Sequence, residues 1–111
     1  MKFTTINNPE ITITDLISIY NEKRFRYLYV LNQDGALVGV ISQGDLLSAI
    51  SKLDHYKTVY DVMQHNFLTI TDVNHITKKM LKFLKKNHID EIPIVDKKGH
   101  LKDVYSIFEL L

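Results

Sequence analysis

The chain has 111 residues, 45% of them hydrophobic, and a formal net charge of +1. Such a chain can form a compact core, and its small charge gives no electrostatic basis for binding nucleic acid or an anionic membrane. The lack of cysteine excludes disulfides, thiolate metal ligands and a cysteine nucleophile. Because the sequence shows neither a signal-peptide core nor an apolar run of membrane-spanning length, we expect a cytoplasmic protein.

The first half of the chain predicts the element order strand, helix, strand, strand, helix. A short strand is expected at residues 3–6, and Asn8 followed by Pro9 indicates that a helix begins there. The apolar stripe of this helix has helical spacing and consists of Ile13, Leu16, Ile17 and Tyr20. Residues 27–31 and 37–41 then predict a hairpin, which a second helix follows.

The second half predicts the same elements with different surface chemistry. A strand is expected at residues 67–70, and a helix follows it. The apolar stripe of this helix consists of Ile76, Met80, Leu81 and Leu84. Residues 92–95 and 101–105 predict the second hairpin. The joining stretch 51–63 is rich in neither glycine nor proline, which indicates a packed connector rather than a flexible tether.

The polar face of the helix in the second half is basic. It carries Lys78, Lys79, Lys82, Lys85 and Lys86. A solvated helix face explains such a run of charge, and a docking surface for an acidic partner is the alternative.

The two halves are copies of one unit. Residues 3–47 align with residues 67–111 without a gap, at a constant offset of 64 residues. Units of this kind usually pack against each other, because each one alone leaves an apolar face exposed. We therefore expect an α/β fold of two β-α-β-β-α units, residues 1–53 and 54–111, packed with pseudo-two-fold symmetry around a ligand cleft.

The two copies differ at their ends. The helix expected from Ser106 has few residues left, whereas its equivalent in the first copy runs past Ala49. Residues 59–63 lead into the second copy, and almost nothing equivalent precedes the first. We therefore expect a fragment of a longer chain, in which a regulatory module is joined to a further domain.

The sharpest local motif is the segment 39–45, where a strand ends and a helix begins. Ser42 stands at the helix start, where free backbone amides attract phosphate, and Asp45 could accept both hydrogens of a ribose diol. The pattern Ser42-x-x-Asp45 also fits a capping box, in which the two side chains satisfy each other's backbone amides. Ser106 and Glu109 repeat this pattern, so a nucleotide site and a helix cap both remain open.

Three stretches of the chain resemble a known family. They are residues 29–46 (YVLNQDGALVGVISQGDL), 60–63 (YDVM) and 92–96 (IPIVD). In order and spacing they resemble a tandem pair of CBS domains, named for cystathionine beta-synthase and also called a Bateman module. The resemblance implies a disc-like module with two clefts that binds AMP, ADP, ATP or S-adenosylmethionine and regulates a fused or partner domain.

The resemblance also implies site residues. In the first cleft Asp45 would hold the ribose and Ser42 the phosphate, while Thr5, Phe25 and Tyr27 would line the base. Arg24 and His88, at equivalent places in the two copies, could reach phosphate. Phe25 and Tyr27 also fit core positions, and Arg24 also fits a solvated helix end.

The second cleft departs from the family pattern. Its equivalent residues are Thr69, Ile89, Ser106 and Glu109. Asp103 stands where the first copy has Gly39, and Glu109 replaces aspartate, which moves the carboxylate by about 1 Å or more. We therefore expect this site to be degenerate. The first copy departs as well, since Tyr29 stands where the second has Pro93 and could narrow the base pocket.

Other chemistry finds no support in the sequence. The five histidines show no pair at the i, i+4 spacing of a helical metal site, and no nucleophile, base and orienting group form a set. We therefore expect no metal site, no catalytic residues and no enzyme activity.

Three functional hypotheses follow. The first is a regulatory module that binds an adenosine-containing ligand between the repeats. The second is a ligand-free structural module that forms a homodimer, and Asp103 and Glu109 favour it. The third places the module N-terminal to a sugar-nucleotide transferase domain, by analogy alone.

Overall fold

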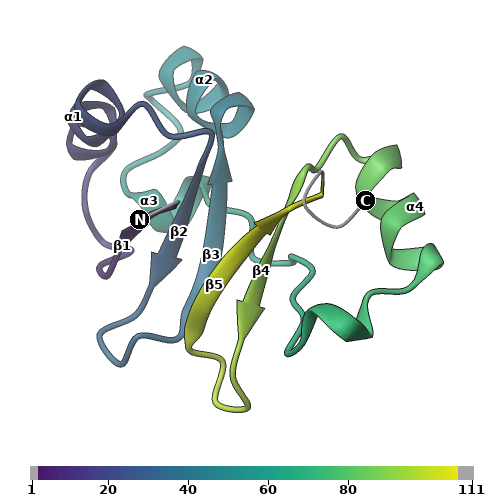
Figure 1. The fold of residues 1–111 in the computed structure, drawn as a ribbon. Helices are drawn as coiled ribbons and strands as arrows, with labels where there is room; N and C mark the ends of the chain where they lie inside the picture. The colour runs from purple at the N-terminus through teal and green to yellow at the C-terminus, as the bar shows by residue number, and fades with distance from the viewer. Residues whose placement is uncertain (1–2, 108–111) are drawn as a thin grey trace. The chain divides into compact units, whose positions relative to one another are not determined.

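The computed structural model describes residues 3–107, whose path Figure 1 shows. They divide into two compact units: unit 1 is Met1–Phe67 and unit 2 is Leu68–Leu111. No helix within residues 3–107 is long and apolar enough to cross a membrane.

Unit 1 contains a three-stranded sheet and three helices. In chain order its elements are β1 (Thr4–Ile6), α1 (Ile13–Lys23), β2 (Tyr27–Leu31), β3 (Leu37–Ser42), α2 (Gln43–Ser51) and α3 (Val59–Val62). The central strand β2 pairs in parallel with β1 and antiparallel with β3. Helices α1 and α2 lie next to each other above this sheet in Figure 1.

The two faces of this sheet have different surroundings. Leu28, Val30 and Ile41 point to one face and are fully buried against residues of α1 and α2. Side chains alternate between the faces of a strand, so their neighbours point to the other face, here called the second face. Register places on it Thr5, Tyr27, Tyr29, Val40 and Ser42.

The first helix begins later than the sequence predicts. Thr12 caps α1, because its hydroxyl accepts the N–H of Asp15 at 3.1 Å and the Asp15 carboxylate accepts the N–H of Thr12 at 3.2 Å. The prediction of a helix start at Asn8 and Pro9 was wrong. The Asn8 side chain accepts the N–H of Glu10 at 2.9 Å, which forms a local turn instead.

The connector is packed, as its composition predicts. Val59 and Met63 are buried in the core of unit 1, and the N–H of Val59 donates to the carbonyl of Ile11 at 2.9 Å. Asp61 accepts the N–H groups of Lys57 and Thr58, and these two bonds, that of Lys57 first, lower its pKa below the ordinary value of 3.8.

Unit 2 repeats part of this arrangement. Its elements are η1 (Val73–His75), α4 (Lys78–Lys86), β4 (Glu91–Val95) and β5 (Leu101–Ser106). The two strands pair antiparallel, and the core forms around Ile70, Leu84, Ile92 and Ile94. The strand predicted at residues 67–70 is reduced to a single parallel bridge between Ile70 and Ile94.

The backbone keeps the offset of 64 residues in detail. Arg24 and His88 both adopt left-handed φ values, of 51° and 57°, and Gly35 and Gly99 have φ of 86° and 83°. Both hairpins carry a bulge at equivalent positions, between Val30 and Leu31 and between Ile94 and Val95. The duplication that the sequence predicts is therefore confirmed in the folded chain.

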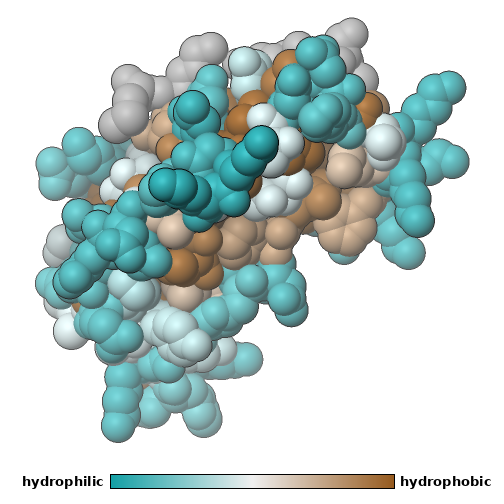
Figure 2. All heavy atoms as spheres, turned by 90° about the horizontal axis from the view of Figure 1, so that it is seen from below, coloured by the Kyte–Doolittle hydropathy of each residue, from teal (hydrophilic) through white to brown (hydrophobic). Residues whose placement is uncertain are grey.

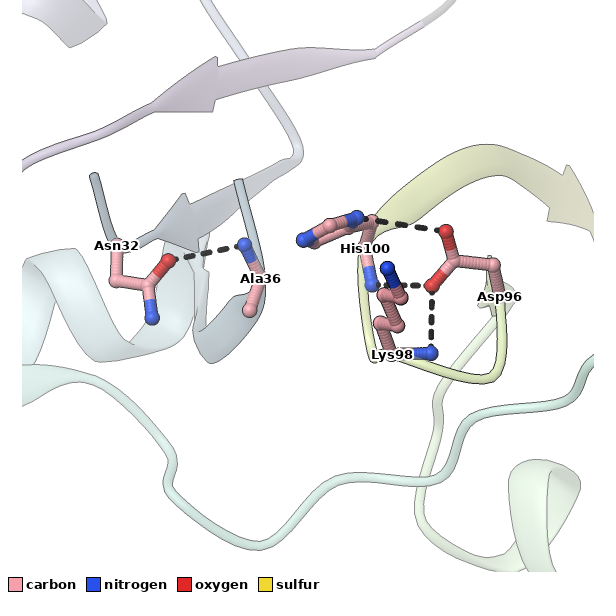
Figure 3. Close-up of polar contacts among 5 residues, drawn as sticks. All are labelled: Asn32, Ala36, Asp96, Lys98 and His100. Atoms are coloured by element: carbon pink, nitrogen blue, oxygen red, sulfur yellow. Dashed lines mark hydrogen bonds and ion pairs between the residues drawn. The ribbon is translucent and has the colours of Figure 1, made fainter. Parts of the chain in front are cut away.

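The hairpin turns also match, as Figure 3 shows. The Asn32 Oδ1 accepts the N–H groups of Asp34 and Ala36 at 3.0 Å. In unit 2 the Asp96 Oδ1 accepts the N–H groups of Lys98 and His100 at 2.9 Å. One residue type is neutral and the other charged, yet they organise the same turn.

Candidate functional site

Ser42 and Asp45 meet at the corner where β3 ends and α2 begins. The Ser42 Oγ accepts the N–H of Asp45 at 3.1 Å, and the Asp45 Oδ2 accepts the N–H of Ser42 at 2.9 Å. This is a complete capping box, so the capping interpretation of the motif is confirmed.

The capping box leaves hydrogen-bond acceptor positions of the Asp45 carboxylate unoccupied. An ionised carboxylate offers about four lone-pair positions, and the cap occupies one of them. A second is filled by the Gln64 side chain, whose Nε2 donates to Asp45 Oδ1 at 3.0 Å. Two acceptor positions therefore remain on a half-buried carboxylate, enough for the two hydroxyls of a ribose diol.

Gln64 is a member of this site that the sequence motifs do not point to. It follows α3 by two residues and forms an isolated antiparallel bridge with Val40 of β3. Its N–H donates to the Val40 carbonyl at 2.8 Å, and its carbonyl accepts the Val40 N–H at 3.2 Å. The contact joins segments 19 residues apart, so only the folded chain reveals it.

Two of the expected base-lining residues share the second face with Ser42. Thr5 pairs with Tyr29 across β1 and β2, and Tyr27 pairs with Ser42 across β2 and β3. Thr5, Tyr27 and Ser42 are each half-buried. Phe25 is placed differently, since it is 4% exposed within the core of unit 1.

Arg24 and Phe25 take part in an aromatic cluster at the end of α1. Tyr20 and Phe25 pack edge to face with ring centroids 5.2 Å apart, and the Arg24 guanidinium lies 5.5 Å from the centre of the Tyr20 ring. Gln43 Nε2 donates to the Phe25 carbonyl at 3.3 Å. These contacts give Arg24 and Phe25 structural roles, and their predicted roles toward a ligand stay predictions.

The residues predicted for the second site lie in unit 2. Thr69, Ile89 and Ser106 are half-buried, and Ile89 packs against the core of that unit. His88 is exposed in its left-handed conformation. Glu109 lies outside the described residues, so the predicted degenerate site stays a prediction.

Gly39 has a packing role that its match to the family pattern does not convey. A Cβ at this position would lie 2.3 Å from Sδ and 3.0 Å from Cβ of Met63. The buried Met63 therefore requires a glycine there. At the equivalent place in unit 2, the Asp103 Oδ1 accepts the N–H of Val104 at 2.8 Å. Asp103 thus has a local structural role, and the degenerate second site that it suggests stays a prediction.

Within residues 3–107, no three histidine or acidic side chains form a group that could hold a metal ion. The chemistry at the Ser42–Asp45 corner is that of hydrogen bonding. A hydroxyl, a carboxylate and a carboxamide can hold a polar ligand there.

Sequence comparison relates the chain to known proteins. The family model described as CBS domain matches residues 8–52. The inosine-5'-monophosphate dehydrogenase of Bifidobacterium longum is 29% identical over 101 residues, which are 90% of this chain and 18% of that protein. An uncharacterised protein of Methanocaldococcus jannaschii is 30% identical over 107 residues, which are 94% of this chain and 34% of that protein. The chain thus spans only a minor part of these relatives.

Solved structures agree over nearly the whole chain. A CBS domain pair in complex with 5-methylthioadenosine and S-adenosyl-L-methionine matches with a TM-score of 0.74 at 21% identity, covering 99% of this chain and 90% of that one. The protein CBSX2 in complex with AMP matches with a TM-score of 0.71 at 24% identity, covering 97% and 82%. The cytosolic domain of the magnesium channel MgtE in complex with ATP matches with a TM-score of 0.74 at 19% identity, covering 99% and 45%. At these identities the likeness establishes the fold.

Proposed function

We propose, from the CBS domain in residues 8–52 and the CBS-pair fold of the whole chain, that this protein is a non-catalytic regulatory module that binds an adenosine-containing ligand. Its ligand would be AMP, ADP, ATP or S-adenosylmethionine. Its place of action would be the cytoplasm.

One observation carries this proposal: the corner formed by Ser42 and Asp45. The carboxylate there is fixed by two hydrogen bonds and keeps two acceptor positions for a ribose diol. At the start of α2 the N–H groups of Ser42, Gln43 and Asp45 already donate, to Asp45, to the Arg26 carbonyl and to Ser42. The group there that could donate to a phosphate is therefore the Ser42 hydroxyl. Thr5 and Tyr27, on the same face of the sheet, extend the surface on which a base could lie.

The ligands bound by structurally similar proteins indicate the chemical class of the proposed ligand. Three proteins with this fold were solved with ATP, with AMP, and with S-adenosyl-L-methionine together with 5-methylthioadenosine. All these molecules contain adenosine. They share the ribose and the adenine base, which are the groups the proposed site would recognise.

The regulatory role requires an output beyond these residues. A ligand shifts a conformational equilibrium only to the extent that it binds one state better than the other. We propose that ligand binding changes the relation between the two repeats, 1–53 and 54–111, and that a fused or partner domain responds. A sugar-nucleotide transferase domain is one candidate for that output.

Calorimetric titration of the 111-residue chain with AMP, ADP, ATP and S-adenosylmethionine tests this function. Saturable binding to at least one ligand is expected, with a loss of at least about tenfold in Asp45→Ala and in the cap-preserving Asp45→Asn. Asp34→Ala, which removes an exposed carboxylate from the first hairpin turn, is the matched control and should bind as the unmodified chain does. No binding of any of the four ligands would refute the proposal.

A second candidate function is a structural homodimer without a ligand. Helix α2 and the residues that follow it expose large apolar side chains: Leu47 is 67% exposed, Ile50 42% and Leu53 52%. Figure 2 shows a different face of the molecule, on which hydrophobic side chains reach the surface among hydrophilic ones. Two of these side chains, Leu47 and Ile50, are spaced by three residues on α2, and exposed apolar side chains at such spacing favour association with a second surface.

Light scattering separates the two candidates. If this face holds a dimer, the double variant Leu47→Lys/Ile50→Lys should have an average molar mass closer to that of the monomer, whether or not ATP is present. A monomer at all concentrations would refute the structural candidate.

A further inference from the structure

We propose that Gln64 positions the Asp45 carboxylate and thereby sets the preference of the site for ligands with a vicinal diol. The inference rests on the proposed function, because it concerns the same site. It adds a residue from outside the β3–α2 motif.

The backbone fixes Gln64 beside the sheet. Two hydrogen bonds with Val40, of 2.8 and 3.2 Å, make Gln64 a one-residue extension of the sheet next to β3. Residues directly opposite each other in such a pair point to the same face. Gln64 therefore points to the second face and completes a row across the sheet with Thr5, Tyr29 and Val40.

The side chain of Gln64 fixes the other half of the carboxylate. The cap holds Asp45 through Oδ2, and Gln64 holds it through Oδ1 at 3.0 Å. With one oxygen held, the carboxylate can still turn about its last bond, since that torsion is broad. With both held, its plane is fixed, and the two remaining acceptor positions keep a defined direction. A diol that donates two hydrogen bonds then binds without the entropy loss of ordering the carboxylate.

Gln64 is not needed for the helix cap. The hydrogen bonds between Ser42 and Asp45 involve only those two residues, and the bridge to Val40 uses only the Gln64 backbone. The Gln64 side chain is exposed, so an apolar replacement leaves no buried polar group without a partner. Removal of its carboxamide should therefore change ligand binding and leave the stability of the fold nearly unchanged.

The test is a double-mutant cycle on the full chain, with two pairs of probes. The variants are Gln64→Leu, Asp45→Ala and the double variant, and the probes are AMP and ATP with their 2′,3′-dideoxy counterparts. Gln33→Leu, which removes an exposed glutamine from the first hairpin turn, is the matched control. Thermal unfolding of each variant is followed by circular dichroism.

We expect Gln64→Leu to weaken binding of AMP or ATP by about threefold to tenfold, and to have no such effect in the Asp45→Ala background. Binding of the dideoxy probes should not respond to Gln64→Leu, because they lack the diol. A merely structural role of Gln64 would weaken binding of both kinds of probe alike and would overturn the proposal.

Three further outcomes are decisive. Unchanged or tighter binding of AMP or ATP in Gln64→Leu, together with a loss in Asp45→Ala, would overturn the role of Gln64 and leave the proposed function standing. An equal loss in Gln33→Leu would overturn it as well. No binding of either nucleotide to the unmodified chain would overturn both.

Discussion

Gly39 matches the family pattern, and the structure shows a packing reason for a glycine at this position. Its missing Cβ makes room for Met63, which is 4% exposed and brings the connector into the core of unit 1. The close approach involves Cβ of Met63 as well as the flexible end of that side chain, so a rotamer change alone would not relieve it. The glycine thus supports the packing of the connector, and its match to the family pattern is not by itself evidence of a ligand site.

Two glycine substitutions test whether packing against Met63 requires Gly39. Gly39→Ala should lower the free energy of unfolding by about 1–3 kcal/mol, because the added methyl overlaps Met63. Gly44→Ala is the matched control, since a Cβ there meets only the Ser42 Oγ, at 3.6 Å, in the first turn of α2. It should raise the free energy of unfolding by up to about 1 kcal/mol. Urea denaturation measures both, and a shift of the same sign in the two variants would refute the packing argument.

Asp96 and Asn32 provide an internal comparison of charge. They accept equivalent backbone hydrogen bonds in the two hairpin turns, but only Asp96 can titrate. The N–H of His100, with a smaller contribution from that of Lys98, lowers the pKa of Asp96 below the ordinary value of 3.8. A lowered carboxyl pKa contributes stability above the ordinary value, and this stability is lost as the pH falls through the lower folded value.

Asp96→Asn should therefore make unit 2 less sensitive to acid. The turn should persist, because Asn32 forms the same turn in unit 1. Thermal unfolding between pH 6 and pH 2.5 should show a smaller decrease of Tm below pH 4 in this variant than in the unmodified chain. Asp34→Asn, an exposed turn carboxylate, is the control, and an equal reduction in both would contradict the role of Asp96.

At the scale of elements, α4 differs from its equivalent α1 mainly in charge. The helix α1 has Asp15 in its first turn and a complete capping box, whereas α4 has Lys78 and Lys79 in its first turn and no acidic residue. Within residues 3–107, none of the five lysine side chains of α4 has a hydrogen-bond or ion-pair partner. Positive charge at a helix N-terminus opposes the helix dipole, so α4 folds in spite of its first turn.

Charge reversal at the two ends of α4 tests whether the lysines of its first turn oppose the helix dipole. Lys79→Glu should raise the free energy of unfolding by about 0.3–1 kcal/mol, and Lys86→Glu, in the last turn, should lower it by a similar amount. Both effects should shrink in 1 M salt, because salt screens exposed charges. Denaturant titrations at low and high salt measure them, and equal effects of the two substitutions would contradict the dipole argument.

Elements defined by local chemistry were the ones the sequence could predict. Both hairpins agree with prediction to within one residue at each strand end. Each turn is built from neighbouring residues, Asn32 or Asp96 and a glycine with positive φ. The start of α1 was missed because Asn8 forms a turn of its own. The strand predicted at 67–70 was wrong except for Ile70, because only this residue pairs with another strand.

The same distinction holds for the site. Ser42 and Asp45 are three residues apart, and their hydrogen bonds follow a short motif that the sequence displays. Gln64 reaches Asp45 only because the connector returns to pair with β3. No single-sequence pattern contains that contact.

At the scale of the whole molecule, the predicted division of the repeats and the division of the compact units lie at different residues. The sequence predicts a division between residues 53 and 54, whereas the compact units divide between Phe67 and Leu68. The connector explains the difference, because its Val59 and Met63 belong to the core of unit 1. A fragment that ends at the repeat boundary would lack both side chains.

Two fragments test this division. A fragment of residues 1–67 should retain a cooperative thermal transition, while a fragment of residues 1–53 should lose it or melt at a much lower temperature. Circular dichroism on both fragments, with Met63→Ala in the longer one as an intermediate case, measures the effect. Equal stability of the two fragments would show that the connector does not belong to the first folding unit.

The most direct test of the account is a map of nucleotide-induced chemical-shift changes on the isotopically labelled chain. Titration with AMP, and separately with ATP, should shift the backbone amides of Ser42, Asp45 and Thr5 and the side-chain amide of Gln64. The amide of Gln33 should stay unchanged. Changes confined to other residues, or none at saturating nucleotide, would contradict the assignment of the β3–α2 corner as the binding site.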